Sequence, residues 1–222
     1  MTLKANKIKK KFLEPVPLEL LKGIELSVEP GQTIAIMGKS GEGKSTLLHI
    51  LGTLDTASEG TLEIAGQPVT RHNVARIRNE SIGFVFQSFY LLEDYTVLQN
   101  ALMPAKIARK AVHEGSRAYF QAVDLLEQVG LKDRMHHFGK QLSGGEKQRV
   151  AIARALCNNP EIIFADEPSG NLDSHTAIGI HSLLLNFAKE KKKSLILVTH
   201  DQDLANLCDV CYSLKDGLLV LT

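Results

Sequence analysis

The stretch GKSGEGKST, from Gly38 to Thr46, constrains the fold of this chain more than any other feature of its sequence. It fits the pattern G-x-x-x-x-G-K-[ST] and directly follows the apolar run TIAIM at 33–37. When such a loop joins a buried strand to a helix, its glycines let backbone N–H groups turn inward around phosphate oxygens, and the helix dipole adds positive charge. The stretch therefore predicts a P-loop fold for nucleotide binding, with a strand at 33–37 and a helix at 44–52.

The side chains of this loop have distinct expected roles. Lys44 should reach the β- and γ-phosphates, the Ser45 hydroxyl should ligate Mg²⁺, and Thr46 should help to hold the α-phosphate. The other nucleotide-binding positions are Gly38, Lys39, Ser40, Gly41, Glu42 and Gly43. Glu42 is unusual, because it places a carboxylate in an anion-binding loop. We expect it to face solvent or a partner, since an inward carboxylate would weaken nucleotide binding.

Apolar runs alternate with helical patterns along the rest of the chain. Further strands are expected at 8–14, 21–30, 60–66, 81–87, 161–166 and 194–200, with edge strands at 210–217 and 218–222. Helices are expected at 96–110, 116–130, 174–193 and 202–208, and another should begin after Ser143. This alternation predicts an α/β fold with a mostly parallel sheet covered on both faces, and the helical block in the middle indicates an insertion.

Polar side chains end three of these expected strands. The run EIIFAD closes on Asp166, which is positioned as a second Mg²⁺ contact, and Glu167 follows it as a candidate general base for the attacking water. Gln87 and His200 end two other strands. Since the carboxyl ends of parallel strands carry the site, both should reach the γ-phosphate, and Gln87 is also a candidate metal ligand.

The stretch LSGGEKQRVAIARAL at 142–156 predicts a second anion site. Ser143 and Glu146 form an S-x-x-E capping box, and Gly144 and Gly145 leave the first helical turn bare. A single ATP bound at the phosphate loop needs only one anion site. The second anion site is explained if it covers the γ-phosphate of an ATP bound to another copy of the chain. We therefore expect a homodimer that buries two ATPs.

Taken in order, these motifs resemble those of the ATP-binding cassette (ABC) ATPases. They are Gly38 to Thr46 as the Walker A loop, Gln87 as the Q-loop, Ser143 to Gln148 as the signature, Ile162 to Asp166 as Walker B with Glu167 after it, Ser169 to Asp173 as the D-loop, and His200 as the switch histidine. The resemblance covers nearly the whole chain. It implies a single domain with a RecA-like, mostly parallel core sheet and an antiparallel β subdomain at about 1–90 and 158–222, and an inserted α-helical subdomain at about 91–157.

The resemblance also implies a mechanism and partners. Phe12 matches the aromatic residue that stacks on adenine, although it lacks the hydroxyl of the tyrosine common there, and Asp173 would lie across the dimer interface. ATP would close two such domains, and hydrolysis with Glu167 and His200 would open them. This motion would act on integral membrane permease subunits through a groove lined by residues 88–100.

Longer stretches are similar to one branch of the family, which contains lipoprotein-releasing ATPases, macrolide exporters and a cell-division ATPase. They are LLHILGTLDTASEGTLEIAGQPV, IRNESIGFVFQSFYLLEDYTVLQNALMP and VAIARALCNNPEIIFADEPSGNLD. We expect release of lipoproteins from the inner membrane toward the outer membrane, and the cell-division and macrolide-exporter ATPases stay open as alternatives. Chromosome and repair ATPases also carry the signature, but this chain lacks their coiled coils between Walker A and signature.

Composition and charge narrow the partners and the location. The formal net charge is only +1, so we expect no nucleic-acid binding. The basic start has no apolar stretch behind it, and no apolar run approaches the roughly 20 residues of a membrane span. We therefore expect a cytoplasmic protein that is peripheral on the cytoplasmic face of the inner membrane.

Overall fold

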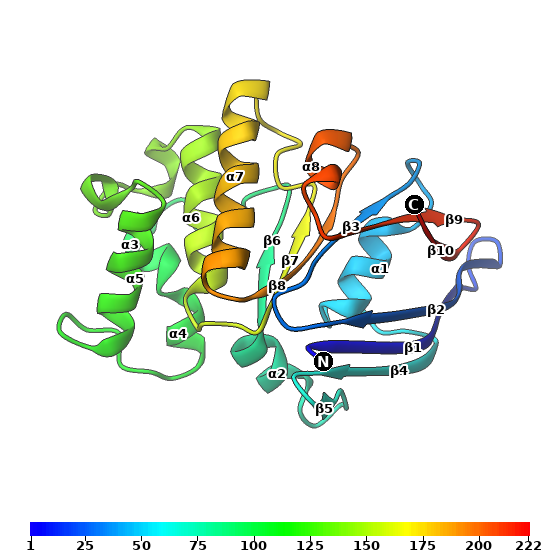
Figure 1. Ribbon diagram of the computed structural model, residues 1–222. Helices are drawn as coiled ribbons and strands as arrows, with labels where there is room; N and C mark the ends of the chain where they lie inside the picture. Colours follow the sequence, from blue (N-terminus) through cyan, green and yellow to red (C-terminus); the bar gives the residue numbers. More distant parts are fainter.

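Two β-sheets form the framework of the computed structural model, which describes residues 1–222 (Figure 1). The larger sheet has the order β10-β9-β3-β8-β7-β6. Its strands are β3 (Thr33–Met37), β6 (Ile82–Val85), β7 (Ile162–Asp166), β8 (Ser194–Val198), β9 (Val210–Lys215) and β10 (Leu218–Leu221). All neighbours in it are parallel except β10 against β9. The smaller sheet is antiparallel, in the order β2-β1-β4-β5, and contains β1 (Leu3–Phe12), β2 (Leu18–Val28), β4 (Glu59–Ile64) and β5 (Gln67–Pro68).

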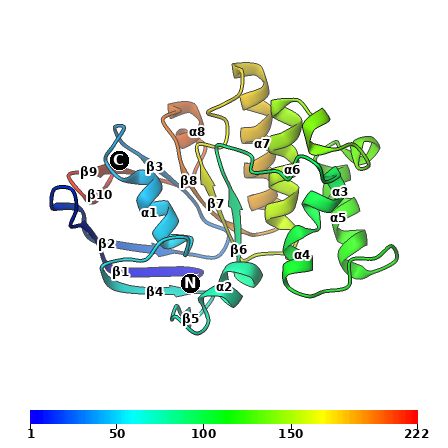
Figure 2. The same cartoon turned by 180° about the vertical axis from the view of Figure 1, so that it is seen from behind.

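Helices cover the core sheet and extend from one side of it. They are α1 (Lys44–Leu51), α2 (Val74–Ser81), α3 (Val97–Ala101), α4 (Met103–Ile107), α5 (Arg117–Gln128), α6 (Gly144–Leu156), α7 (Ser174–Glu190) and α8 (Gln202–Asn206). In both views α3 to α6 gather at the end of the molecule opposite the β1–β2 hairpin (Figure 2). None of the helices combines the length and the apolar character that a membrane-spanning segment requires.

The strands of the core sheet are buried on both faces, as their apolar runs predict. In β7, Ile163 and Ala165 join the core that includes α6 and α7, whereas Ile162 and Phe164 join the core that includes α1 and the small sheet. The two faces therefore fix the register of β7, because a slip of one residue would exchange them. This burial holds the parallel strand ends, and the loops that follow them, in fixed positions.

The expected α/β architecture is confirmed, with local differences. The expected helix at 96–110 is two helices, α3 and α4, because Pro104 lies in the first turn of α4 and has no N–H for a continuous helix. Helix α2 was not expected from the sequence, since Ile77 is its only buried residue and gives no periodic pattern. Strand β1 begins at Leu3 rather than at residue 8, and β9 lies between β10 and β3 rather than at an edge.

Close packing of α6 against the edge strand β6 depends on Gly83. A Cβ at this position would lie 2.5 Å from the carbonyl oxygen of Ala155, so Gly83→Ala must push the helix from the strand. We expect a loss of about 1–3 kcal/mol in the free energy of unfolding, measured by urea denaturation. Gly179→Ala on α7 is the matched control, because nothing lies within 4 Å of the added methyl group. It should stabilise the helix by about 0.5–1 kcal/mol, and equal stability of the two variants would contradict this packing.

Candidate functional site

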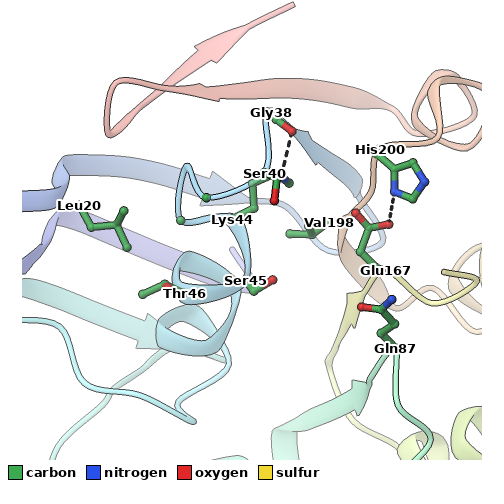
Figure 3. A pocket seen from close by; sticks show the side chains of 12 residues that line it. Leu20, Gly38, Ser40, Lys44, Ser45, Thr46, Gln87, Glu167, Val198 and His200 are labelled. Carbon is green, nitrogen blue, oxygen red and sulfur yellow. Dashed lines mark hydrogen bonds and ion pairs between the residues drawn. The ribbon is translucent and has the colours of Figure 1, made fainter. Parts of the chain in front are cut away.

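The phosphate loop lies where it was expected, between β3 and α1 (Figure 3). It lines a cavity of about 490 Å³. The lining residues are Leu20, Gly38, Ser40, Gly41, Gly43, Lys44, Ser45, Thr46, Gln87, Glu167, Val198 and His200. Leu20 lies on one side of this cavity, and Gln87, Glu167 and His200 lie on the other (Figure 3). The structure thus brings together side chains that follow β3, β6, β7 and β8, as parallel pairing requires.

Helix α1 begins inside the loop because of Gly43. This residue has a left-handed backbone with φ of 96°, and a Cβ on it would lie 2.8 Å from the Leu20 side chain, so both conformation and space require glycine. No side chain caps the N-terminus of α1. Its first N–H groups are therefore free to bind an anion, which supports the expected role of the loop.

Two charged side chains turn back onto the loop itself. The Lys44 ammonium donates hydrogen bonds to the carbonyl oxygens of Gly38 and Lys39, at 2.8 and 2.9 Å. The Glu42 carboxylate accepts the backbone N–H of Lys39 at 2.8 Å. Glu42 is half-buried against its own loop and does not line the cavity, so the inward position that would weaken nucleotide binding is not observed. A backbone N–H without a partner attracts the nearest anion, and here that anion is the Glu42 carboxylate of the same loop.

Ser45 and Asp166 form the expected oxygen pair. The Ser45 hydroxyl donates a hydrogen bond of 3.0 Å to Asp166, and burial raises the pKa of the Asp166 carboxyl. Adjacent hydroxyl and carboxylate oxygens are ligands that Mg²⁺ prefers, so this pair fits the ion. His49, one turn along α1, places its Nε2 atom 3.6 Å from Asp166, a neighbour that the sequence pattern did not identify.

Glu167 and His200 face each other across the cavity wall. The Glu167 carboxylate and the His200 Nδ1 atom are 2.9 Å apart (Figure 3). Glu167 is well shielded, with 19% of its side chain exposed, whereas His200 is 77% exposed. The backbone of Glu167 has φ of 43°, a strained conformation for a residue with a side chain, and it directs the carboxylate away from the strand that ends at Asp166. A shielded carboxylate beside an imidazole is suited to proton transfer.

Gln87 has a partner that sequence reasoning missed. Its side-chain amide donates to Asn171 Oδ1 at 3.3 Å, and the Asn171 amide donates to the Gln87 carbonyl oxygen at 3.1 Å. These reciprocal bonds join the segment after β6 to the segment before α7. Asn171 lies in the stretch SGNLD, but nothing in that stretch alone indicates which residue it contacts.

The capping box at the start of α6 is present as expected. The Ser143 hydroxyl accepts the N–H of Glu146 at 3.3 Å, and the Glu146 carboxylate accepts the N–H of Ser143 at 2.9 Å. The serine hydroxyl also lies 2.9 Å from that carboxylate. Ser143, Gly144 and Gly145 line a second cavity of about 320 Å³, together with Asp173. This cavity shares no lining residue with the cavity at the phosphate loop.

Five expected site residues outside the signature do not line the first cavity, namely Lys39, Glu42, Asp166, Asp173 and Phe12. Asp173 caps α7 by accepting the N–H of Thr176 at 3.0 Å and its hydroxyl at 2.6 Å, and these bonds hold the pKa of Asp173 below its usual value. Phe12 is 40% exposed at the end of β1, with the Lys10 ammonium 5.3 Å from its ring centre. It does not line the first cavity, and Leu20 forms the apolar wall there instead.

Comparison with known proteins gives consistent matches over almost the whole chain. The family model described as ABC transporter matches residues 21–170. The lipoprotein-releasing system ATP-binding protein LolD of Protochlamydia amoebophila is 55% identical over 99% of this chain and 96% of its own length. LolD of Porphyromonas gingivalis is 44% identical over 99% of both chains. The dimeric structure of MJ0796, a bacterial ABC transporter cassette, has a TM-score of 0.87 at 37% identity and covers 98% of this chain and 96% of its own. The same cassette is also known in a dimeric post-hydrolysis state bound to ADP and Pi, again at 37% identity.

The negative charge of Glu42 on the phosphate loop generates a specific expectation for nucleotide affinity. Glu42→Gln removes a negative charge from the phosphate loop but leaves a side-chain oxygen that can accept the Lys39 N–H. We expect ATP to bind about three- to tenfold more tightly, because charge repulsion is relieved. Titration with a fluorescent ATP analogue measures this. Glu190→Gln, the same change at the exposed end of α7, should leave the affinity unaltered. Unchanged or weaker binding by Glu42→Gln would refute the repulsion.

Proposed function

This chain belongs to the ABC transporter family and is an ATPase subunit of that family, and from that premise we propose that it drives the release of lipoproteins from the inner membrane toward the outer membrane. The observation that carries the proposal is the match, at 44–55% identity over nearly the full chain, to relatives named as lipoprotein-releasing ATP-binding proteins. In this role the protein is peripheral on the cytoplasmic face of the membrane.

The side chains at the first cavity have separate roles in ATP hydrolysis. Lys44 leaves its carbonyl partners and binds the β- and γ-phosphates, while the uncapped N-terminus of α1 faces the anion. Ser45 and Asp166, with Gln87, would hold Mg²⁺, which would neutralise phosphate charge. Glu167 accepts a hydrogen bond from the attacking water and takes its proton. His200 holds the γ-phosphate from the exposed side of the cavity.

The second cavity completes the site of another copy. Ser143 and the first turn of α6 form an anion site that the same chain's phosphate loop does not share. Two chains arranged head to tail give each ATP both a phosphate loop and a signature helix, and Asp173 lies at the interface between them. The dimeric arrangement of the similar cassette supports this proposal. ATP then favours the closed dimer, and its hydrolysis reopens it.

Force passes to the membrane through a groove beside β6. A cavity of about 400 Å³ lies between α2 and α4, with Phe84, Met103 and Ile107 among its lining residues. Ile107 is 65% exposed, and Tyr90 in the neighbouring segment is 67% exposed. We assign residues 88–100, together with this cavity, to contact with LolC/LolE-like permease subunits. Arg154 links the two, because it lines the cavity and donates to the carbonyl oxygens of Phe89 and Tyr90. The helices at 91–157 act as the subdomain that carries the signature.

The dimer is tested with the variant Glu167→Gln. It should still bind ATP but lose hydrolysis by about 100-fold or more, because the water lacks its base. Without hydrolysis the closed state accumulates, so size-exclusion chromatography with ATP should show a dimer, and without ATP a monomer. The double variant Glu167→Gln with Ser143→Arg is the control, since the arginine should block closure and give a monomer in both conditions. Full-rate hydrolysis by a monomer would refute the composite site.

The cargo is tested by isolating the membrane partner. Tagged Glu167→Gln protein should be extracted from native membranes in mild detergent with ATP, together with one or two permeases that have large periplasmic domains and carry acylated lipoprotein. A small four-span partner linked to cell-wall enzymes would instead support the cell-division alternative. Ile107→Asp is the control, because an exposed charge in the apolar groove should abolish capture while ATP binding persists. Recovery without any membrane protein would overturn the transporter role.

A further inference from the structure

Gln148 is a polar side chain buried at the junction of three functional segments. It lies on α6 with 0% of its surface exposed. Its amide nitrogen donates hydrogen bonds to the carbonyl oxygens of Pro168, at 2.6 Å, and Phe86, at 3.2 Å. Phe86 directly precedes Gln87, and Pro168 directly follows Glu167. One amide group on the signature helix therefore holds the backbone next to both residues.

The remaining half of this amide is unsatisfied. The Gln148 Oε1 atom is buried and has no hydrogen-bond partner. Burying a polar oxygen without a partner is unfavourable, and an apolar side chain of the same size would avoid the cost. The two N–H bonds thus explain why an amide is used here. They tie together the chain after β6 and the chain after β7, which no hydrogen bond of the sheet joins at this level.

A second residue of α6 holds the continuation of the same segment. The Arg154 guanidinium donates to the carbonyl oxygens of Phe89 and Tyr90, at 2.8 and 2.5 Å, and burial lowers the pKa of Arg154 to about 10. Together with Gln148, this arginine fixes the backbone on both sides of Gln87. A shift of α6 therefore cannot leave Gln87 in place.

We propose that Gln148 is a positioning residue for hydrolysis, which holds Gln87 and Glu167 in register with the signature helix. Ser143 begins this helix, and Gln148 follows less than two turns later. When the start of α6 docks on the phosphate of another copy, the two amide bonds transmit its position to the general base and to the Q-loop glutamine of its own chain. This inference rests on the roles proposed above for Gln87 and Glu167.

The test compares Gln148→Met with Gln128→Met. Methionine has a volume similar to that of glutamine but has no hydrogen-bond donor. Gln128 is the control, because it is an exposed glutamine of α5 whose amide contacts only Asp124. Steady-state ATPase kinetics should show that Gln148→Met loses about 10- to 100-fold in kcat, with KM for ATP changed less than about twofold. Gln128→Met should match the unmodified protein in both constants. Urea denaturation gives the stability of each variant.

A double variant separates positioning from stability. If Gln148 acts through Gln87, then Gln148→Met should cost much less kcat in a Gln87→Ala background than alone. A purely structural glutamine would lower stability and leave kcat per folded molecule unchanged, and that result would overturn the proposal. Additive effects of Gln148→Met and Gln87→Ala on kcat would overturn the positioning of Gln87. If Gln148→Met does not fold, Gln148→Asn provides the same comparison, because its shorter amide cannot reach both carbonyls.

The same assays distinguish this inference from the function it rests on. Normal hydrolysis by Gln87→Ala and Glu167→Gln would refute the roles of those two residues. Loss of hydrolysis in both, with normal kcat in Gln148→Met, would refute only the positioning role of Gln148.

Discussion

Parallel pairing of β3, β8, β7 and β6 is the constraint on which the rest of the structure depends. Because these strands point the same way and are buried on both faces, their carboxyl ends are held at one edge of the sheet. Lys44 and His200, which are far apart in the sequence, thereby line one cavity. The chemistry of this edge comes from the loops after the strands, whereas its precision comes from the core beneath them.

Nucleotide binding at this edge is an exchange of partners. The Lys44 ammonium is bound to two loop carbonyls, and the Lys39 N–H is bound to the Glu42 carboxylate. A phosphate in the cavity must compete with the carbonyl contacts of Lys44, so the net affinity is smaller than the sum of its new hydrogen bonds. These contacts also hold the loop in shape, because they restrict the Lys44 and Glu42 side chains to one conformation. The same hydrogen bonds therefore preorganise the loop for the nucleotide and compete with its phosphates.

The sequence predicted features that are set locally and missed those that depend on distant contacts. The strand–loop–helix at Gly38 to Thr46 and the capping box at Ser143 were predicted because each pattern determines its own backbone. The orientation of Glu42 depends on one unpaired N–H, and the contact between Gln148 and Phe86 crosses 62 positions of the chain. No periodic pattern carries such information. The position of Leu20 as the apolar wall likewise depends on how the two sheets meet.

Helix α6 links the two cavities that we propose as anion sites of a single chain. Its first turn lines the second cavity, and Gln148, further along it, contacts the backbone beside residues that line the first. Gly83 lets the same helix lie directly on β6, so no side chain layer between them can absorb a shift. Close-packed elements move as units rather than deforming smoothly. If an anion binds at Ser143 as proposed, it acts on Gln87 and Glu167 through one rigid helix, and the chain then ties its own hydrolysis to contact with a second copy.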